Sequence, residues 1–593
     1  MSRCPLAVLA GGLALAAALL APTGAAAADS FTVTALNFKV AVGPAGDKTC
    51  NVVGDLYLPR SASSSKRVPA ILTTNGFGGS KADQAGLARY FAKRGYAVLS
   101  YSGLGFGGSG CQITLDDPDY DGRAASQLIS YLAGRPGIAF TDAAHTAAAP
   151  RLRAVRLDRA DDPRVGMIGV SYGGGIQFAT ASVDKRLDTI IPGATWNDLS
   201  YSLAPNNTTQ VRGVTTSTPG AAKLLWALGF TASGVSNGVQ NLPADPGRIL
   251  PCPNFATFVC PGLVTAGLTG TLDASTRDHL RHASVTSYVS KVRVPTLLLQ
   301  GQADTLFNLN EATATFQALR KQGTPTKLVW VNGGHSGPMA KGEIDFGAPD
   351  YASQHVTKRV TDWFDHYLKG TSASTGPLFT YFRDWVDYTG SARPAYASSS
   401  TFPVGTAKRF YLSGASGLTT STSRLTKGST SFLTPVAGLP TSSDPLDVVS
   451  SVAPSPLPET DLPGTAGTWT SGALGSRIDV VGSPRLTLRV DAPLANLSAV
   501  DALKLVLFVK VLDVDTTGKA TLVRDLVAPV RVADVTKPFT ATLPAFAHRF
   551  APGHQVRLVV AGGSTNYRGG TVPTPVTVST GSTSQVLSLP VVR

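Results

Sequence analysis

The chain has few charged residues and few cysteines for its 593 residues. Charged side chains make up 15%, and the five cysteines form no C-x-x-C pair, so the sequence offers no zinc-binding thiolate cluster. It also lacks a phosphate-binding loop. Lysine and arginine give a net charge of +14, but they are scattered without a dense basic run or interleaved aromatics. This pattern argues against a nucleic-acid partner.

The chain is rich in apolar residues, at 43%, which is typical of a globular protein. Its length predicts two or three domains. Residues 1–28 have a basic start, an apolar centre and an Ala-x-Ala ending, so we expect a signal peptide that is removed after about Ala28. A retained membrane anchor is the weaker alternative, because the apolar run is barely long enough to span a bilayer. We therefore expect a secreted, extracellular protein.

Four cysteines remain after the signal peptide, since Cys4 lies within it. An even number in an exported protein predicts two disulfides. Pairing Cys252 with Cys260 would close a small loop, and pairing Cys50 with Cys111 would tie the first strands to a loop near the expected active face. This is one of three possible pairings.

The stretch from Arg164 to Ser182 predicts a strand, a tight turn and a helix, with Ser171 at the turn. The residues two before and two after this serine are glycines, as a strained strand-to-helix turn requires. Such a turn exposes the serine oxygen and directs the amide of Tyr172 to the place where a substrate oxygen would become negative. The alternative is a glycine-rich connection without chemical importance.

Strand and helix patterns alternate around this turn, which predicts a doubly wound, mostly parallel sheet of the α/β class. The pattern changes to loops and helical pieces over residues 196–290, which we interpret as a cap inserted over the site. Many short alternating strands near the end of the chain predict a separate β-sandwich. The expected organisation is a core of residues 29–195 and 291–400, a cap of residues 196–290, and a β-sandwich of residues 405–593.

Two further residues complete a candidate catalytic triad. Asp304 and His335 each follow an expected parallel strand, and the order Ser171, Asp304, His335 is that of α/β-hydrolases. A serine needs a base to take its proton, and the base needs a carboxylate behind it. Asp304 could instead cap the helix that follows it. For the oxyanion hole we expect the amides of Tyr172 and Phe77, although Phe77 could also serve only as an aromatic wall.

The motifs GVSYGGG, QGQAD, NGGH and WFDHYLKG, followed by a β-sandwich, resemble the peptidase S15/CocE-like family of X-Pro dipeptidyl-peptidases and cocaine esterase. The resemblance implies an α/β-hydrolase core with a helical cap and a C-terminal jelly-roll of the galactose-binding-like type. It also implies nucleophile Ser171, acid Asp304, base His335 and the oxyanion amide of Tyr172. The family often supplies a tyrosine hydroxyl to the oxyanion hole, but this chain has Phe77 there, which has no hydroxyl.

The expected substrate is a small ester or a peptide. A dipeptidyl-peptidase must pair its substrate's ammonium with acidic groups, yet residues 197–290 contain no glutamate, and basic residues outnumber aspartates there. Core loops could supply the charge. The aspartates concerned are Asp198, Asp245, Asp273 and Asp278 in the cap, and Asp83, Asp116 and Asp117 in the core.

We therefore expect a secreted serine hydrolase that forms an acyl-enzyme and needs no cofactor or metal. Its substrate would be an ester or an X-Pro peptide bond. One alternative is a carboxylic ester hydrolase without peptidase activity. An alternative of another class is an inactive cell-surface or carbohydrate-binding protein that uses the jelly-roll.

Overall fold

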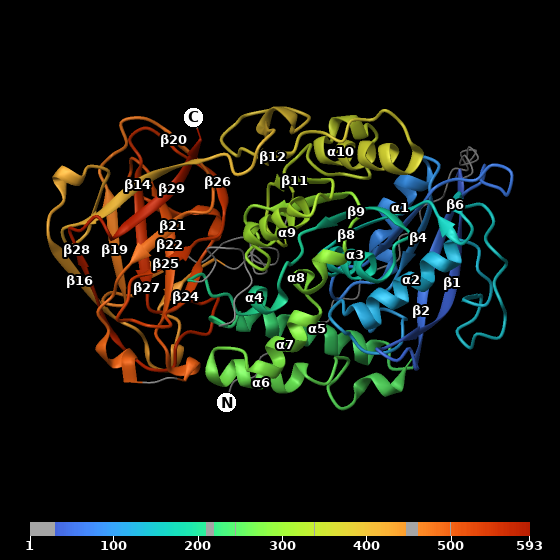
Figure 1. The fold of residues 1–593 in the computed structure, drawn as a ribbon, viewed down its shortest axis with the longest axis horizontal. Helices are drawn as coiled ribbons and strands as arrows, with labels where there is room; N and C mark the ends of the chain where they lie inside the picture. The colour runs from blue at the N-terminus through green and yellow to red at the C-terminus, as the bar shows by residue number, and fades with distance from the viewer. Residues whose placement is uncertain are drawn as a thin grey trace, which may run out of the picture.

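The structure is a computed structural model, and it describes residues 30–208, 219–243, 245–336, 339–445, 460–497 and 500–592. The expected signal peptide and Cys4 lie outside these ranges. In Figure 1 a β-rich domain stands beside an α/β core, and a group of helices runs along one side of the core toward the β-rich domain. Within the described ranges, no helix has the length and apolar character needed to cross a membrane.

The core is built on an eleven-stranded sheet with the order β13-β12-β11-β10-β9-β8-β3-β4-β2-β1-β5. In this spatial order, the strands from β12 across to β4 run parallel. Strands β1, β2, β5 and β13 add antiparallel edges. The sheet confirms the predicted α/β-hydrolase fold. Its strands are β1 (Phe31–Val42), β2 (Lys48–Pro59), β3 (Ala70–Thr74), β4 (Ala97–Tyr101), β5 (Ala139–Phe140), β8 (Val165–Val170), β9 (Leu187–Gly193), β10 (Thr296–Gly301), β11 (Thr326–Val331), β12 (Phe379–Phe382) and β13 (Tyr396–Ser399).

Helices cover both faces of the sheet, so its central strands are buried on both sides, and every residue of β3 and β4 is buried. Alternate side chains of β3 enter different clusters: Ile71 packs in one with Phe91 and Trp363, and Leu72 in another with Phe178. The helices on the first face are α1 (Ala85–Ala92) and α10 (His355–Phe364), and those on the second are α2 (Arg123–Leu132), α3 (Tyr172–Val183) and α9 (Leu309–Lys321).

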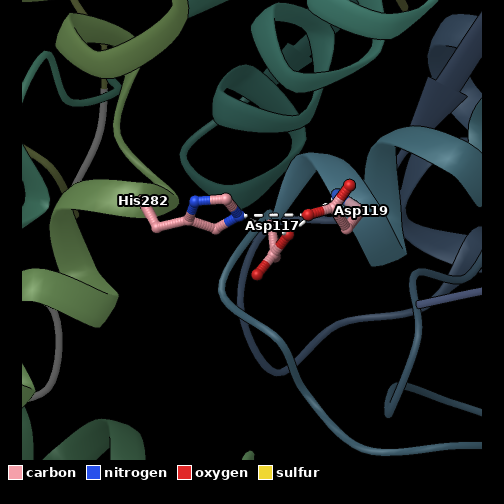
Figure 2. Close-up of side chains that lie close together, drawn as sticks. All are labelled: Asp117, Asp119 and His282. Carbon is pink, nitrogen blue, oxygen red and sulfur yellow. Dashed lines mark hydrogen bonds and ion pairs between the residues drawn. The ribbon is translucent and has the colours of Figure 1, made fainter. Parts of the chain in front are cut away.

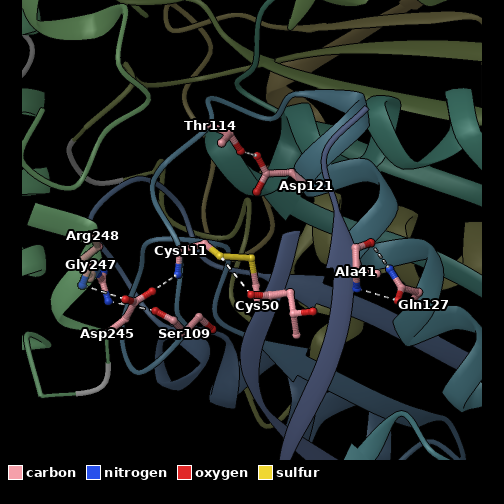
Figure 3. The surroundings of a disulfide bond; sticks show 11 residues. Ala41, Cys50, Ser109, Cys111, Thr114, Asp121, Gln127, Asp245, Gly247 and Arg248 are labelled. Atoms are coloured by element: carbon pink, nitrogen blue, oxygen red, sulfur yellow. Dashed lines mark hydrogen bonds between the residues drawn. A yellow bond between two sulfur atoms is a disulfide. The ribbon is translucent and has the colours of Figure 1, made fainter. Parts of the chain in front are cut away.

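Helices between β9 and β10 form the cap (green in Figure 1). A disulfide joins Cys252 to Cys260 inside it, and a second joins Cys50 on β2 to Cys111 in the loop after β4, so both predicted pairs are present. The cap also contacts this loop, because Asp245 accepts a hydrogen bond from the Cys111 amide at 2.7 Å (Figure 3). The cap helices are α4 (Leu199–Leu203), α5 (Leu224–Gln240), α6 (Val259–Thr269), α7 (Ala274–His282) and α8 (Val285–Tyr288).

The C-terminal domain is rich in β-strands, consistent with the predicted β-sandwich. A twelve-stranded sheet and a separate β16–β28 pair enclose its own apolar core. Its strands are β14 (Thr406–Ser413), β15 (Gly417–Thr419), β16 (Gly428–Leu433), β17 (Ser442–Ser443), β18 (Thr460–Asp461), β19 (Ala466–Ser471), β20 (Ile478–Gly482), β21 (Arg485–Leu488), β22 (Val506–Val514), β23 (Ala520–Leu522), β24 (Ala528–Arg531), β25 (Phe539–Thr542), β26 (Phe546–Phe550), β27 (Gln555–Ala561), β28 (Pro575–Thr580) and β29 (Val586–Val592).

Two arginines of the C-terminal domain hold the cap in place. Arg531 is fully buried, and its guanidinium donates to the carbonyl oxygens of Gly220 at 3.0 Å and of Gly270, just past the end of α6, at 3.2 Å. Arg568 donates from Nε to the carbonyl oxygen of Gly267 at 3.2 Å. The carbonyl groups at the end of a helix lack intrahelical partners and carry negative partial charge, which cations stabilise.

Replacing Arg531 with methionine should destabilise the protein by about 2–4 kcal/mol, because buried carbonyl groups would lose their donors. We also expect faster proteolysis within the cap. Urea unfolding and limited proteolysis measure the two effects. Arg159→Met is the matched control, since the Arg159 side chain is 77% exposed and should change stability by no more than about 0.5 kcal/mol. Equal unfolding curves for the two variants would contradict a role of Arg531 in stabilising the cap.

Candidate active site

Ser171 lies at the turn between β8 and α3 in a backbone conformation that few residues adopt, with φ +60° and ψ −120°. The strain is held by hydrogen bonds on both sides. The Ser171 amide donates to the Gly193 carbonyl at 2.9 Å, and its carbonyl accepts from the amides of Gly174 and Gly175. Such strain persists only where the surrounding structure fixes it, and it often marks a functional position.

The glycines around Ser171 are required by close backbone contacts. A Cβ atom on Gly169 would lie 2.5 Å from the carbonyl oxygen of Gly173, and one on Gly173 would lie 2.6 Å from that of Thr74. Both distances are shorter than any tolerated contact, and the obstacles are backbone atoms. The turn therefore needs glycine at both positions, as the sequence pattern predicts.

The structure brings Ser171, His335 and Asp304 into one line. Nε2 of His335 lies 3.0 Å from Oγ of Ser171, and Nδ1 of the same ring lies 3.0 Å from Oδ2 of Asp304. Asp304 is fully buried and the His335 side chain is 8% exposed. The three residues follow β8, β10 and β11, parallel strands of one sheet that end at the same edge.

Asp304 does not cap the following helix, so that alternative is wrong. Asn308 is the N-cap residue of α9. Asp304 instead fixes the turn after it, because Oδ1 accepts from the amides of Leu306 at 2.9 Å and of Phe307 at 2.7 Å. Gln300 donates to Oδ2 at 2.9 Å. The carboxylate is thus oriented toward His335 by several donors.

Lys223, which no sequence motif predicts as part of the site, contacts the same turn from the cap. Its ammonium group donates to the carbonyl oxygens of Thr305 at 2.7 Å and of Leu306 at 2.6 Å. Complete burial lowers the pKa of Lys223 to about 8, and the negative charges of Asp304 and Glu311 oppose this shift. No local sequence motif predicts this contact, since Thr305 and Leu306 lie far from Lys223 in the sequence.

The loop that carries His335 is held by the chain beyond it. Glu343 accepts from the Asn332 amide at 2.8 Å, and Arg524 of the C-terminal domain donates to Oδ1 of Asn332 at 3.2 Å. The rings of Phe307 and Trp226 meet the imidazole nearly perpendicularly, with centroids 5.0 and 5.7 Å away. Core, cap and C-terminal domain therefore all contribute to the position of the imidazole.

Phe77 and Tyr172, the two expected oxyanion residues, lie beside Ser171, and both line the same cavity. Their rings are 6.0 Å apart, and Phe77 also packs against Phe106, Phe230 and Phe255. Phe77 is therefore part of an aromatic wall of the cavity. Among the described residues, its amide donates no hydrogen bond to another protein group. A role of this amide in an oxyanion hole stays a prediction.

Behind Tyr172 lies a pair of buried acids that the sequence analysis did not connect with it. The Tyr172 hydroxyl donates to Asp121 at 3.3 Å and accepts from the Asp116 amide at 3.1 Å, and Thr114 also donates to Asp121. Burial raises the pKa of Asp121 to about 7, and burial with the neighbouring Asp121 raises that of Asp116 further. These buried acids thus hold the hydroxyl of Tyr172 in place.

The raised pKa of Asp121 should appear in the pH dependence of stability. Between about pH 4 and pH 7 the unfolded carboxyl loses its proton while the folded one keeps it, so stability falls as the pH rises. Asp121→Asn removes this loss. From pH 4.5 to pH 8, urea unfolding should show the variant gaining on the order of 2–4 kcal/mol over the unsubstituted protein.

The control for this experiment is Asp278→Asn, because Asp278 has a side chain that is 66% exposed. This variant should follow the unsubstituted protein at every pH. Parallel curves for Asp121→Asn would show that Asp121 is ionised in the folded protein across this range.

A cavity lies between Ser171 and the cap. Its empty space is about 950 Å³, including the part open to solvent. The walls are almost entirely aliphatic and aromatic, and Lys223 is the charged residue among the described residues that line it. A largely apolar concave site beside a strained, hydrogen-bonded serine has the character of a binding pocket. Typical wall residues are Trp196, Leu203, Leu224, Phe230, Phe258 and Leu263.

Within the described part of the chain, Asp117, Asp119 and His282 are a group of side chains that could offer ligands to a metal ion. Figure 2 shows His282 reaching from cap helix α7 toward the two aspartates of the core. Nε2 of His282 lies 3.4 Å from Asp117 and 3.3 Å from Asp119. The residues contact one another directly, and none of them lines the cavity. We interpret the group as a contact between cap and core.

Three family models match the chain. The model of the X-Pro dipeptidyl-peptidase (S15 family) matches residues 48–228, and that of the X-Pro dipeptidyl-peptidase C-terminal non-catalytic domain matches residues 322–588. The prolyl oligopeptidase family model matches residues 264–371. Ser171 lies within the first match, Asp304 within the third, and His335 within the second and third.

Several solved structures share the fold over nearly the whole chain. They include a CocE/NonD family hydrolase from Staphylococcus aureus (TM-score 0.58, 14% identity, 94% of this chain and 97% of that chain). An α-amino acid ester hydrolase gives a TM-score of 0.62 at 15% identity, over 96% of this chain and 98% of that chain. An aminopeptidase from a Thaumarchaeota archaeon gives 0.59 at 12% identity, over 97% and 99%. At these identities the likeness establishes the fold.

One curated relative, an uncharacterised protein of Pseudomonas aeruginosa, is 26% identical over 142 residues. The match covers 24% of this chain, and the chain spans about a third (32%) of that relative's length. The two proteins thus share a segment of sequence.

Proposed function

We propose that this chain, which belongs to the S15/CocE-like family of hydrolases, is a serine hydrolase that works through an acyl-enzyme. One observation carries the proposal: the unbroken line from Ser171 through His335 to Asp304, with 3.0 Å at each contact. A base at this distance can accept the serine proton, and a buried carboxylate behind it can stabilise the imidazolium that forms.

The reaction follows from these positions. Oγ of Ser171 attacks the substrate carbonyl carbon while its proton passes to Nε2 of His335. The tetrahedral intermediate then expels the alcohol or amine, which takes that proton from His335. Water, with His335 again as base, attacks the acyl-enzyme and releases the acid and the free serine.

The amides of Tyr172 and Phe77 are the proposed donors to the oxyanion. Tyr172 is the first residue of α3, so its amide has no partner within the helix and lies at the positive end of the helix dipole. This position supports the proposal, and the Phe77 amide, which donates to no protein group among the described residues, supports it further.

The bond cleaved is an ester or an X-Pro-type peptide bond, and the alternative is a carboxylic ester hydrolase without peptidase activity. Gly-Pro and Ala-Pro p-nitroanilides, compared with short-chain p-nitrophenyl esters, separate these possibilities. Release of p-nitroaniline with little ester turnover would identify a dipeptidyl-peptidase, and ester turnover alone would identify an esterase. The two disulfides support a site of action outside the cell.

Ser171→Ala should lower kcat at least about 10³-fold on whichever substrate is cleaved, because the nucleophile is gone. It should also abolish covalent labelling by a fluorophosphonate probe. Ser182→Ala, at the other end of α3, is the matched control and should keep both activity and labelling. Activity that survives in Ser171→Ala would refute the proposed nucleophile.

The rival function from another class is a binding protein in which the hydrolase domain is inactive. Fluorophosphonate labelling separates the two directly, because the probe needs an activated serine. An unlabelled but folded protein would favour the binding role.

A further inference from the structure

The cavity beside Ser171 is lined mostly by apolar side chains, and its few polar side chains, such as Lys223, are bonded to protein groups. Around Phe77 an aromatic wall forms, with ring centroids 4.9 Å away for Phe230 and 5.1 Å for Phe106. Cap helices α5 and α6 add aliphatic side chains from the other side. Burying an apolar group against these walls is favourable, and burying an unpaired charge there is costly.

The positive charge of Lys223 at the cavity wall disfavours binding of a second cation in the cavity. The Lys223 ammonium is fixed on the carbonyl oxygens of Thr305 and Leu306, and the side chain is fully buried. A substrate with a free N-terminal ammonium would bring like charge into the same low-dielectric space, where repulsion is weakly screened.

No described carboxylate lines the cavity to pair with such an ammonium. Asp304 is occupied by His335, Glu311 accepts from two backbone amides of the segment before α4, and Asp198 caps α4. Asp121 and Asp116 lie behind Tyr172. The cap residues 209–218, outside the described part, contain no aspartate or glutamate in the sequence. The other candidates also lie elsewhere: Asp83 binds the Ser80 amide, Asp117 lies against His282, Asp245 binds Cys111, Asp273 caps α7 and Asp278 pairs with Arg277.

The position of His335 shows which half of the substrate enters the cavity. The leaving group must receive its proton from Nε2 of His335. Among the described residues, Ser171, Tyr172 and Phe77 line the cavity, whereas His335 does not. The leaving group therefore lies on the histidine side, outside the cavity, and the acyl group lies inside it.

We propose that the substrate is an ester with a neutral, apolar acyl chain, which lies in the cavity under the cap. This inference rests on the proposed acyl-enzyme function and adds the class of acyl group to it. An N-terminal dipeptide with a free ammonium is excluded from the same space, because it would bury an unpaired charge beside Lys223.

The test is a series of p-nitrophenyl esters, from acetate through butyrate and hexanoate to octanoate, assayed with the full mature chain against Gly-Pro p-nitroanilide. We expect kcat/KM to rise about fourfold per added methylene until the cavity is filled. Gly-Pro p-nitroanilide should be turned over far more slowly than p-nitrophenyl octanoate. A flat or falling profile, or a preference for Gly-Pro p-nitroanilide, would overturn the inference.

Two neighbouring positions on α6 give a matched pair of variants. Leu263 lines the cavity, and Val264 is 61% exposed on the outer side of the same helix. Leu263→Trp should lower the octanoate-to-butyrate ratio about tenfold by shortening the cavity, and Val264→Trp should leave the ratio as it is. An unchanged ratio in a folded Leu263→Trp protein would place the acyl chain elsewhere and overturn the inference.

Fluorophosphonate labelling separates the two levels of failure. A labelled protein with the wrong ester profile would refute the acyl class and leave the acyl-enzyme function standing. A protein that is neither labelled nor active on any ester would refute both. The series with the unsubstituted protein decides even if Leu263→Trp fails to fold.

Discussion

The imidazole of His335 has to meet Ser171 and Asp304 at the same time, and the rest of the architecture serves this one geometric requirement. A parallel sheet meets it, because β8, β10 and β11 all end at the same edge and deliver the three side chains there. Each loop is then fixed from outside the core. Lys223 of the cap holds the turn after Asp304, and Arg524 of the C-terminal domain holds the loop before His335.

The polar side chains in and behind the cavity wall are bonded to other protein groups. Asp121 anchors the Tyr172 hydroxyl from behind, and Lys223 directs its ammonium to backbone carbonyls. The side chains that line the cavity itself are mainly apolar, and Ser171 lies among them. Burial makes these polar contacts costly to break, so the cavity keeps its apolar character.

The sequence predicts most of the fold, because alternating strand and helix patterns, glycine spacing and cysteine parity are local signals. It also names the three side chains that the structure brings together, while their catalytic roles stay predictions. Asp304 was ambiguous as a helix cap, and only the contact with His335 and the capping role of Asn308 resolve this. Lys223 and Arg531 could not be found, since their partners are backbone carbonyls distant in sequence, which leave no pattern.

The clamp of Arg531 and Arg568 on α6 has a consequence for how the protein matures. The cap over the site is held by Arg531 and Arg568, which lie far beyond it in the sequence, so these contacts cannot form until both arginines have been synthesised. A chain that is still being synthesised contains Ser171, Asp304 and His335 before it contains Arg531 and Arg568. The cap can therefore be held in place only after these later residues are present, and a chain that ends before Arg531 would have the serine without these contacts.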